Sequence, residues 1–197
     1  MITKIRKVVF DIETANVFAD VGGINDSTRL DISIVGAYDS ATDSYASYSV
    51  DELPKLWPII ERADMLIGFN SDHFDIPLLN KYYPGDLTQI KSLDLLVEVR
   101  RILGRRLRLD TIAEATLGIN KTGHGLEAVQ WWKEGKGDLV RKYCLDDVRI
   151  TKEVYDYVRK NKELKYKDFG DIKSIKLDPK DWEKIPEPSA LTHTLPF

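Results

Sequence analysis

Four acidic residues lie where the surrounding sequence predicts burial, and their positions constrain the fold more than any other feature. Asp11 and Glu13 close the apolar segment 7–13 (KVVFDIE), whose β-branched and aromatic residues predict a strand. Side chains two positions apart in a strand point to the same face, so we expect both carboxylates on one face of a sheet. Asp75 opens a predicted helix shortly after the buried strand predicted for residues 65–69.

The fourth acid, Asp147, lies in the longest predicted helix, residues 138–160. Residues at three- and four-residue steps define one face of this helix, and that face comprises Leu139, Tyr143, Asp147, Ile150, Val154 and Val158. Burying an isolated charge costs several kcal/mol, and this face holds no lysine or arginine that could neutralise Asp147. A divalent cation shared with the other acids is the simplest solution. Asp146 lies ~100° around the helix, and we expect it to face solvent.

The ligand types favour magnesium or manganese over zinc. Carboxylate oxygens are hard ligands, and the chain has a single cysteine and no suitable histidine pair. Two such ions ~3.5–4 Å apart can support phosphodiester hydrolysis. Taken singly, the acids have simpler interpretations: Glu13 as an exposed strand end, Asp75 as a helix cap and Asp147 as half of a surface ion pair. Their occurrence together favours the metal site.

Composition sets broad limits on the protein class. A chain of 197 residues with 43% hydrophobic residues suits one domain with a sizeable core. Without a long apolar run, a signal-peptide pattern or a second cysteine, we expect a soluble, cytoplasmic protein without membrane segments or disulfides. The net charge of −3 excludes a uniformly basic nucleic-acid coat, but it leaves room for a local basic track near an acidic site.

Hydrophobic periodicity predicts an α/β domain with a mixed sheet. The predicted strands are 7–13, 29–38, 44–50 and 65–69. The first predicted helix is capped by Asp51, and the others span 74–82, 126–133 and 138–160. Two further helical pieces are predicted within 93–117, separated near Gly104. A loop is expected over 121–125, a hairpin with its turn at Phe169–Gly170, and a tail over 183–197. Asp72, Asp94 and Asp110 are interpreted as caps or first-turn acids of helices.

Three segments carry a resemblance to a known family. FDIET (10–14), NSDHFDIPLL (70–79) and YCLDDVRIT (143–151) resemble the three exonuclease motifs of the DEDD superfamily, the DnaQ-like 3′–5′ exonucleases. In the third motif, Tyr143 lies four residues before Asp147, so the motif resembles that of the Tyr-containing branch. This branch includes the proofreading domains of family-B DNA polymerases and related stand-alone or helicase-associated bacterial exonucleases. The histidine branch would have histidine where this chain has Lys142.

The resemblance, which covers about residues 7–160, implies an RNase H-like three-layer fold with a central mixed five-stranded sheet flanked by helices. The exonuclease domain would span 1–160, and 161–197 would form a C-terminal hairpin and Pro-containing tail packed on it or extending from it. The implied activity is metal-dependent 3′–5′ hydrolysis of single-stranded nucleic acid, DNA more than RNA, in repair or proofreading. It implies two Mg²⁺ or Mn²⁺ ions as cofactors, nucleoside 5′-monophosphates as products, and a helicase or polymerase as a partner.

The resemblance also implies a role for each motif residue. Asp11, Glu13 and Asp147 would hold the first metal, Asp11 would also contact the second, and Asp75 would act on the second through water. Tyr143 would orient the attacking water.

Further residues are predicted to bind the nucleic acid. Thr14, Asn70 and Phe74 flank the acids and would contact the terminal nucleotide. Arg101, Arg105 and Arg108 would track the phosphates, although a solvated basic face explains these three arginines equally well.

Two other functions share many of these features. A catalytically idle module that binds nucleic acid and recruits a helicase or polymerase would retain the fold, but such modules usually lose a ligand, whereas this chain keeps all four acids and the tyrosine. A structure-selective endonuclease would use the same metals on an uninterrupted strand.

Overall fold

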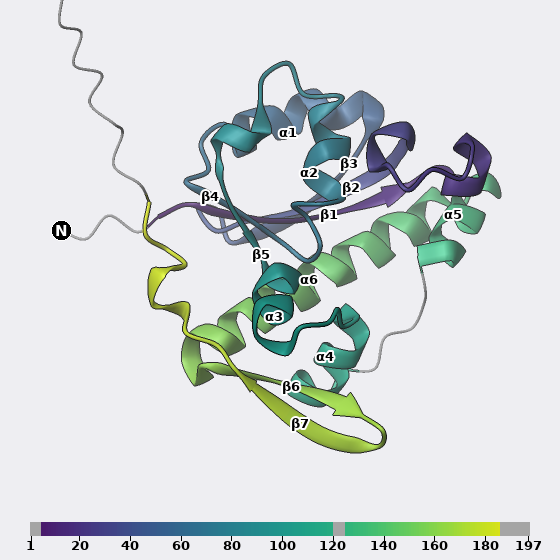
Figure 1. The fold of residues 1–197 in the computed structure, drawn as a ribbon. Helices are drawn as coiled ribbons and strands as arrows, with labels where there is room; N and C mark the ends of the chain where they lie inside the picture. Colours follow the sequence, from purple (N-terminus) through teal and green to yellow (C-terminus); the bar gives the residue numbers. More distant parts are fainter. Residues whose placement is uncertain (1–4, 120–124, 186–197) are drawn as a thin grey trace, which may run out of the picture.

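A mixed five-stranded sheet forms the centre of the computed structural model, which describes residues 5–119 and 125–185 (Figure 1). Its strands are β1 (Lys7–Thr14), β2 (Ile32–Asp39), β3 (Ser44–Ser49), β4 (Met65–Gly68) and β5 (Lys91–Asp94), in the order β3-β2-β1-β4-β5. The β1–β2 and β2–β3 pairs are antiparallel, and the β1–β4 and β4–β5 pairs are parallel. The predicted mixed five-stranded sheet is confirmed.

Helices cover both faces of this sheet (Figure 1). They are α1 (Leu53–Ile60), α2 (Asp75–Asn80), α3 (Leu95–Leu103), α4 (Leu109–Leu117), α5 (Gly125–Lys133) and α6 (Gly137–Asn161), and short 3₁₀ helices span Phe18–Val21, Ser27–Arg29, Val50–Glu52, Leu87–Gln89 and Pro179–Asp181. In β1, Val8, Phe10 and Ile12 pack in one hydrophobic cluster with α1 and α2, whereas Val9 packs in another with α3, α4 and α6. Strand alternation therefore places Asp11 and Glu13 on the α6 face.

A glycine lets α6 approach the sheet beside the first acid. Gly36 of β2 pairs with Asp11 of β1. A Cβ at Gly36 would lie 2.9 Å from the Cys144 Sγ and 3.0 Å from a methyl of Val148, both on α6. Since real Cβ atoms are essentially never found closer than about 3 Å to such neighbours, any larger residue here would push α6, with its Asp147, away from β1.

The predicted C-terminal hairpin is confirmed as β6 (Glu163–Asp168) and β7 (Asp171–Lys176). Its turn places Phe169 at φ 49° and Gly170 at φ 93°. Leu164, Tyr166 and Ile175 are buried in the cluster that also contains α4 and α6 residues, so the hairpin shares the core of the sheet domain.

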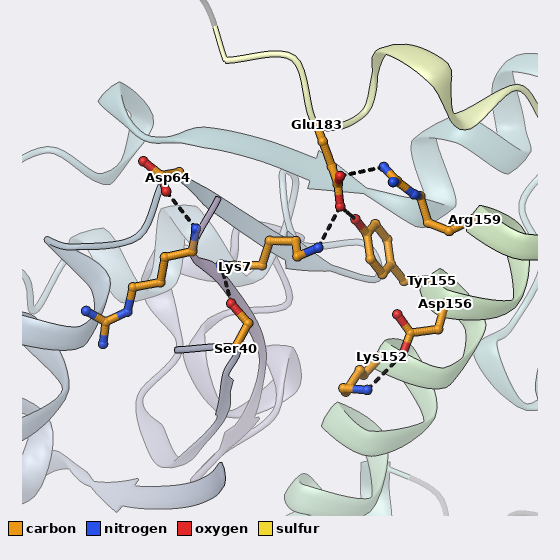
Figure 2. Close-up of polar contacts among 9 residues, drawn as sticks. Lys7, Ser40, Asp64, Lys152, Tyr155, Asp156, Arg159 and Glu183 are labelled. Atoms are coloured by element: carbon orange, nitrogen blue, oxygen red, sulfur yellow. Dashed lines mark hydrogen bonds and ion pairs between the residues drawn. The ribbon is translucent and has the colours of Figure 1, made fainter. Parts of the chain in front are cut away.

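The segment after β7 is anchored to the beginning of the sheet by Glu183 (Figure 2). The Glu183 carboxylate accepts hydrogen bonds from Lys7 Nζ at 2.6 Å and the Tyr155 hydroxyl at 2.5 Å, and it pairs with Arg159 at 2.8 Å. Trp182 stacks on the Tyr155 ring with the ring centroids 5.8 Å apart. Burial and the bond to Glu183 raise the pKa of Tyr155. The predicted tail thus begins with a fixed contact, and residues 186–197 lie outside the described residues.

The structure corrects several strand and cap predictions. β2 begins at Ile32 rather than residue 29, because residues 27–29 form a 3₁₀ turn capped by the Asp26 carboxylate. Asp51 does not cap the helix that follows; Ser49 donates its N–H and its hydroxyl to Glu52 instead. β5 was not located from the sequence, where Leu93 was assigned to a helix, because a four-residue strand shows too little alternation.

The helices were predicted more closely. α6 extends one residue beyond the predicted range at each end, and Gly104 ends α3 in the left-handed conformation, as the predicted interruption requires. The assignment of Leu139 to the buried face is wrong, because this side chain is 45% exposed and Val140 is buried instead. α2 is shorter than predicted, and Asp72 does not cap it, because its carboxylate accepts from the Ser92 hydroxyl.

Two further predictions concern the rest of the chain. α5 agrees with the helix predicted for 126–133 to within one residue, whereas most of the loop predicted over 121–125 lies outside the described residues. Within the described ranges, no helix is long and apolar enough to cross a bilayer.

Candidate active site

Three carboxylates meet between the sheet and α6. Ligand oxygens of Asp11, Glu13 and Asp147 all lie within 4.8 Å of one another. Glu13 and Asp147 are each 6% exposed. The period of two in β1 and the buried face of α6 thus bring together side chains that are 134 to 136 positions apart in the chain.

Asp75 lies at the N-terminus of α2 and is 4% exposed. It is placed by a sharp turn after β4, where a Cβ on Gly68 would lie 2.4 Å from the Ser71 Cβ. Burial, followed by the charge of Asp94, raises the pKa of Asp75 to about 8, although the backbone N–H of Ile12 acts in the opposite direction. Asp75 is outside the three-carboxylate cluster but lines the same cavity.

Asp94 does more than the first-turn role predicted for it. It is the N-cap of α3, is 3% exposed and accepts backbone N–H groups from Leu96 at 2.8 Å, Asn70 at 2.7 Å and Asp72 at 3.1 Å. These bonds hold Asn70 with φ 70°, a conformation that asparagine tolerates better than most residues. Asp94 therefore fixes the loop that presents Asn70 and leads to Asp75.

One cavity of about 730 Å³ brings most of the predicted site together. Its lining includes Asp11, Glu13, Thr14, Asn70, Phe74, Asp75, Arg108, Tyr143 and Asp147. This volume lies within the usual range for cavities that bind small ligands. Sequence analysis missed Asn16 and Phe18, which also line it. Their position directly after the first motif was the available signal, and Phe18 contacts Phe74 edge to face at 6.3 Å.

Tyr143 lies one helical turn before Asp147 on α6 and is 8% exposed. Its ring contacts Trp131 of α5 at a centroid distance of 6.0 Å in a T-shaped arrangement. Trp131 and Trp132 are partly buried against the cluster of Ile34, Val140 and Cys144. α5 thus packs against the tyrosine and limits its rotation.

Cys144, the residue after Tyr143, is fully buried. Its thiol donates to the Asp11 carbonyl oxygen at 3.4 Å. Burial, and then the charges of Asp11, Glu13 and Asp147, raise the pKa of the thiol well above its usual range. The cysteine is therefore a neutral packing residue, and its environment reflects the negative charge concentrated at the cluster.

The predicted arginine track is divided by the structure. Arg108 lines the cavity and pairs with Asp110 at 3.0 Å. Arg101 pairs with Glu98 at 2.9 Å, and Arg105 pairs with Asp168 of the hairpin at 2.7 Å; neither lines the cavity. A role for these arginines in binding nucleic acid stays a prediction.

The cluster fits a divalent metal ion. Its three ligands are all carboxylates, the hard oxygen donors that Mg²⁺ and Mn²⁺ prefer. Their mutual repulsion in a largely buried site would be relieved by a bound cation.

Comparison with known proteins identifies the fold. A family model described as the RNase H superfamily matches residues 8–159. Solved structures include 174 matching chains, among them the family B DNA polymerase from the hyperthermophilic archaeon Pyrobaculum calidifontis. That match has a TM-score of 0.61 and 19% identity, and it covers 79% of this chain but 25% of the polymerase. At this identity, the likeness establishes the fold alone.

A search of curated proteins found no match. The match to the family model covers most of the chain, and the acids it spans converge in one cavity with a metal-compatible cluster. The chain belongs to the RNase H superfamily and has the features of a nuclease.

Proposed function

We propose that this protein is a metal-dependent 3′–5′ exonuclease that shortens single-stranded nucleic acid, DNA more than RNA, and releases nucleoside 5′-monophosphates. One observation carries the proposal: the carboxylates of Asp11, Glu13 and Asp147 cluster in a cavity that also contains Asp75 and Tyr143. The 3′–5′ polarity is supported by the resemblance of the three motifs to those of the DEDD exonucleases.

The acids have distinct roles in this proposal. Asp11, Glu13 and Asp147 would hold the first ion, and Asp11 and Asp75 would serve the second. When bound, the two ions neutralise charge on the scissile phosphate and increase the acidity of the attacking water. The Tyr143 hydroxyl orients that water, and the packing of Trp131 against the tyrosine ring keeps the hydroxyl in position.

The remaining cavity residues hold the terminal nucleotide. The edge-to-face pair of Phe18 and Phe74 offers an aromatic wall against which a base can pack. Thr14 and Asn70 supply polar groups at the same cavity, and Arg108, which pairs with Asp110, adds guanidinium N–H donors for a phosphate.

Single strands should be preferred because a duplex end must melt before its terminal nucleotide can enter the cavity. Melting costs roughly 1.4 kcal/mol per base step, and the sequence has no motor motif that could supply this work. A helicase or polymerase partner would supply unpaired ends. We expect the protein to act in the cytoplasm.

The test is digestion of a 5′-labelled oligonucleotide compared with a circular single strand of the same base composition, with Asp147→Asn as the inactive control. A descending ladder from the linear substrate and an intact circle are expected. Immediate release of a labelled mononucleotide would refute the polarity, and cutting of the circle would favour the endonuclease alternative. Binding without cleavage under all metal conditions would favour the catalytically idle module.

A further inference from the structure

A second, smaller cavity of about 170 Å³ lies beside the catalytic cavity and shares Asn70 with it. Its walls include His73, Asp94, Arg100 and Arg106. These residues come from the loop before α2, from the end of β5, from α3 and from the loop after α3. None of the roles assigned above to the catalytic cavity uses Arg100, Arg106 or His73.

The two arginines of this cavity differ from their neighbours in charge pairing. Arg101 pairs with Glu98 and Arg105 pairs with Asp168. Within residues 5–119 and 125–185, by contrast, Arg100 and Arg106 form no ion pair with a carboxylate. Arg106 instead donates to the side-chain oxygen of Asn70.

The carboxylate in the wall, Asp94, forms no ion pair with either guanidinium group. Asp94 accepts backbone N–H groups of Asn70, Asp72 and Leu96, which occupy its oxygens. His73, which is exposed at the same cavity, adds a ring N–H donor. Two exposed guanidinium groups without carboxylate partners, in a chain with a net charge of −3, form an oxyanion-binding arrangement suited to phosphate.

We propose that this second cavity binds a backbone phosphate of the same nucleic-acid strand whose 3′ end occupies the catalytic cavity. This inference rests on the proposed function, because the substrate of that function supplies the phosphate. Asn70 connects the two cavities: its side chain accepts from Arg106, and its backbone N–H is fixed by Asp94. A strand held by Arg100 and Arg106 would therefore keep its terminal nucleotide in register with the carboxylate cluster.

The first test measures binding, without divalent metal, of a fluorescently labelled oligothymidylate of about twelve nucleotides by fluorescence anisotropy. Arg100→Gln should weaken binding roughly tenfold, because it removes a charge-assisted contact. The slope of log K against log salt should fall in magnitude by about 0.7, the value for one phosphate contact on a single strand.

The matched control is Arg62→Gln, which makes the same charge change at an exposed arginine outside both cavities. It should bind like the wild type. Within the described residues the Arg100 side chain forms no hydrogen bond or ion pair, so thermal unfolding should give nearly the same Tm for both variants and the wild type. Binding and salt slopes that are equal for Arg100→Gln and Arg62→Gln would overturn the proposal.

A second test compares substrate lengths. If Arg100 holds an upstream phosphate, the KM increase in Arg100→Gln should be large for the twelve-nucleotide substrate and much smaller for a dinucleotide, which is too short to fill both cavities. An equal increase for both lengths would refute an upstream subsite. Failure of the wild type to hydrolyse either substrate would refute the proposed exonuclease, while the anisotropy measurement would still decide whether the second cavity binds the strand.

Discussion

Replacing Asp75 with asparagine should make the metal-free protein more stable while it abolishes activity. Burial, followed by the charge of Asp94, raises the pKa of Asp75 from 3.8 to about 8. The folded state therefore holds this proton more tightly than the unfolded state does. The stability that the protonated carboxyl contributes is complete below about pH 4 and is lost as the pH rises through about 8.

The magnitude follows from the pKa difference. At pH 7 the pH is about three units above the pKa of Asp75 in the unfolded state, and each unit corresponds to 1.36 kcal/mol. Keeping the carboxyl protonated in the folded state therefore lowers the free energy of unfolding by about 4 kcal/mol. Water in the open cavity screens part of this cost, so we expect Asp75→Asn to raise the free energy of unfolding by ~1–3 kcal/mol. Asparagine has nearly the same shape and cannot ionise.

The assay is urea unfolding in excess chelator at pH 5 and pH 8. The advantage of Asp75→Asn over the wild type should grow between these two pH values. Asp138→Asn, which changes an exposed acid in the first turn of α6, should show no such growth. If Asp75 were only a helix cap, Asp75→Asn would be as stable as the wild type or less stable at both pH values, and the argument from burial would be wrong.

Four other predictions follow from the site and its surroundings. Chelation should abolish hydrolysis, and Mg²⁺ or Mn²⁺ should restore it; full activity in excess chelator would exclude the metal mechanism. Asp147→Asn should reduce the rate by several orders of magnitude, whereas Tyr143→Phe should reduce it ~10²–10⁴-fold, and a fully active Tyr143→Phe would return that residue to a packing role. Phe169→Asn should raise the free energy of unfolding by ~1 kcal/mol and the Tm by ~2–4 °C, because Phe169 has φ 49° in a turn that favours asparagine; an unchanged Tm would contradict this strain. Burial alone would raise the pKa of Glu183, but its bonds to Lys7 and Tyr155 lower it. In urea unfolding, Glu183→Gln should therefore lower the free energy of unfolding by ~1–2 kcal/mol at pH 7, and by progressively less as the pH falls below about 4. A loss of stability that is independent of pH would refute the charge argument.

The sequence predicted those elements whose signal is long or chemically unusual. α6 repeats its apolar face over 25 residues, so its bounds were predicted to within one residue. Asp11 and Glu13 stood out because acids at the end of an apolar strand need a reason to be there. In contrast, β5 has four residues, and its last residue, Asp94, caps the next helix, so neither periodicity nor composition separates it from α3.

Contacts between distant segments could not be predicted. The pairing of Arg105 with Asp168 joins residues 63 positions apart, and it draws one arginine of the predicted track toward the hairpin. Similarly, the bonds from Asn70 and Asp72 to Asp94 depend on β4 and β5 lying side by side. A cluster of arginines in sequence indicates a charge excess, but only the fold decides which of these charges a carboxylate neutralises.

The Lys7–Glu183 contact has a practical consequence for handling the molecule. It joins residues 176 positions apart, so both ends of the described chain lie at the beginning of β1 (Figures 1 and 2). Asp11 and Glu13 of the carboxylate cluster lie roughly 13–20 Å further along this strand, at a rise of about 3.3 Å per residue. A dye attached at either end of the described chain, at residue 5 or residue 185, would therefore lie near the opposite end of β1 from the carboxylate cluster.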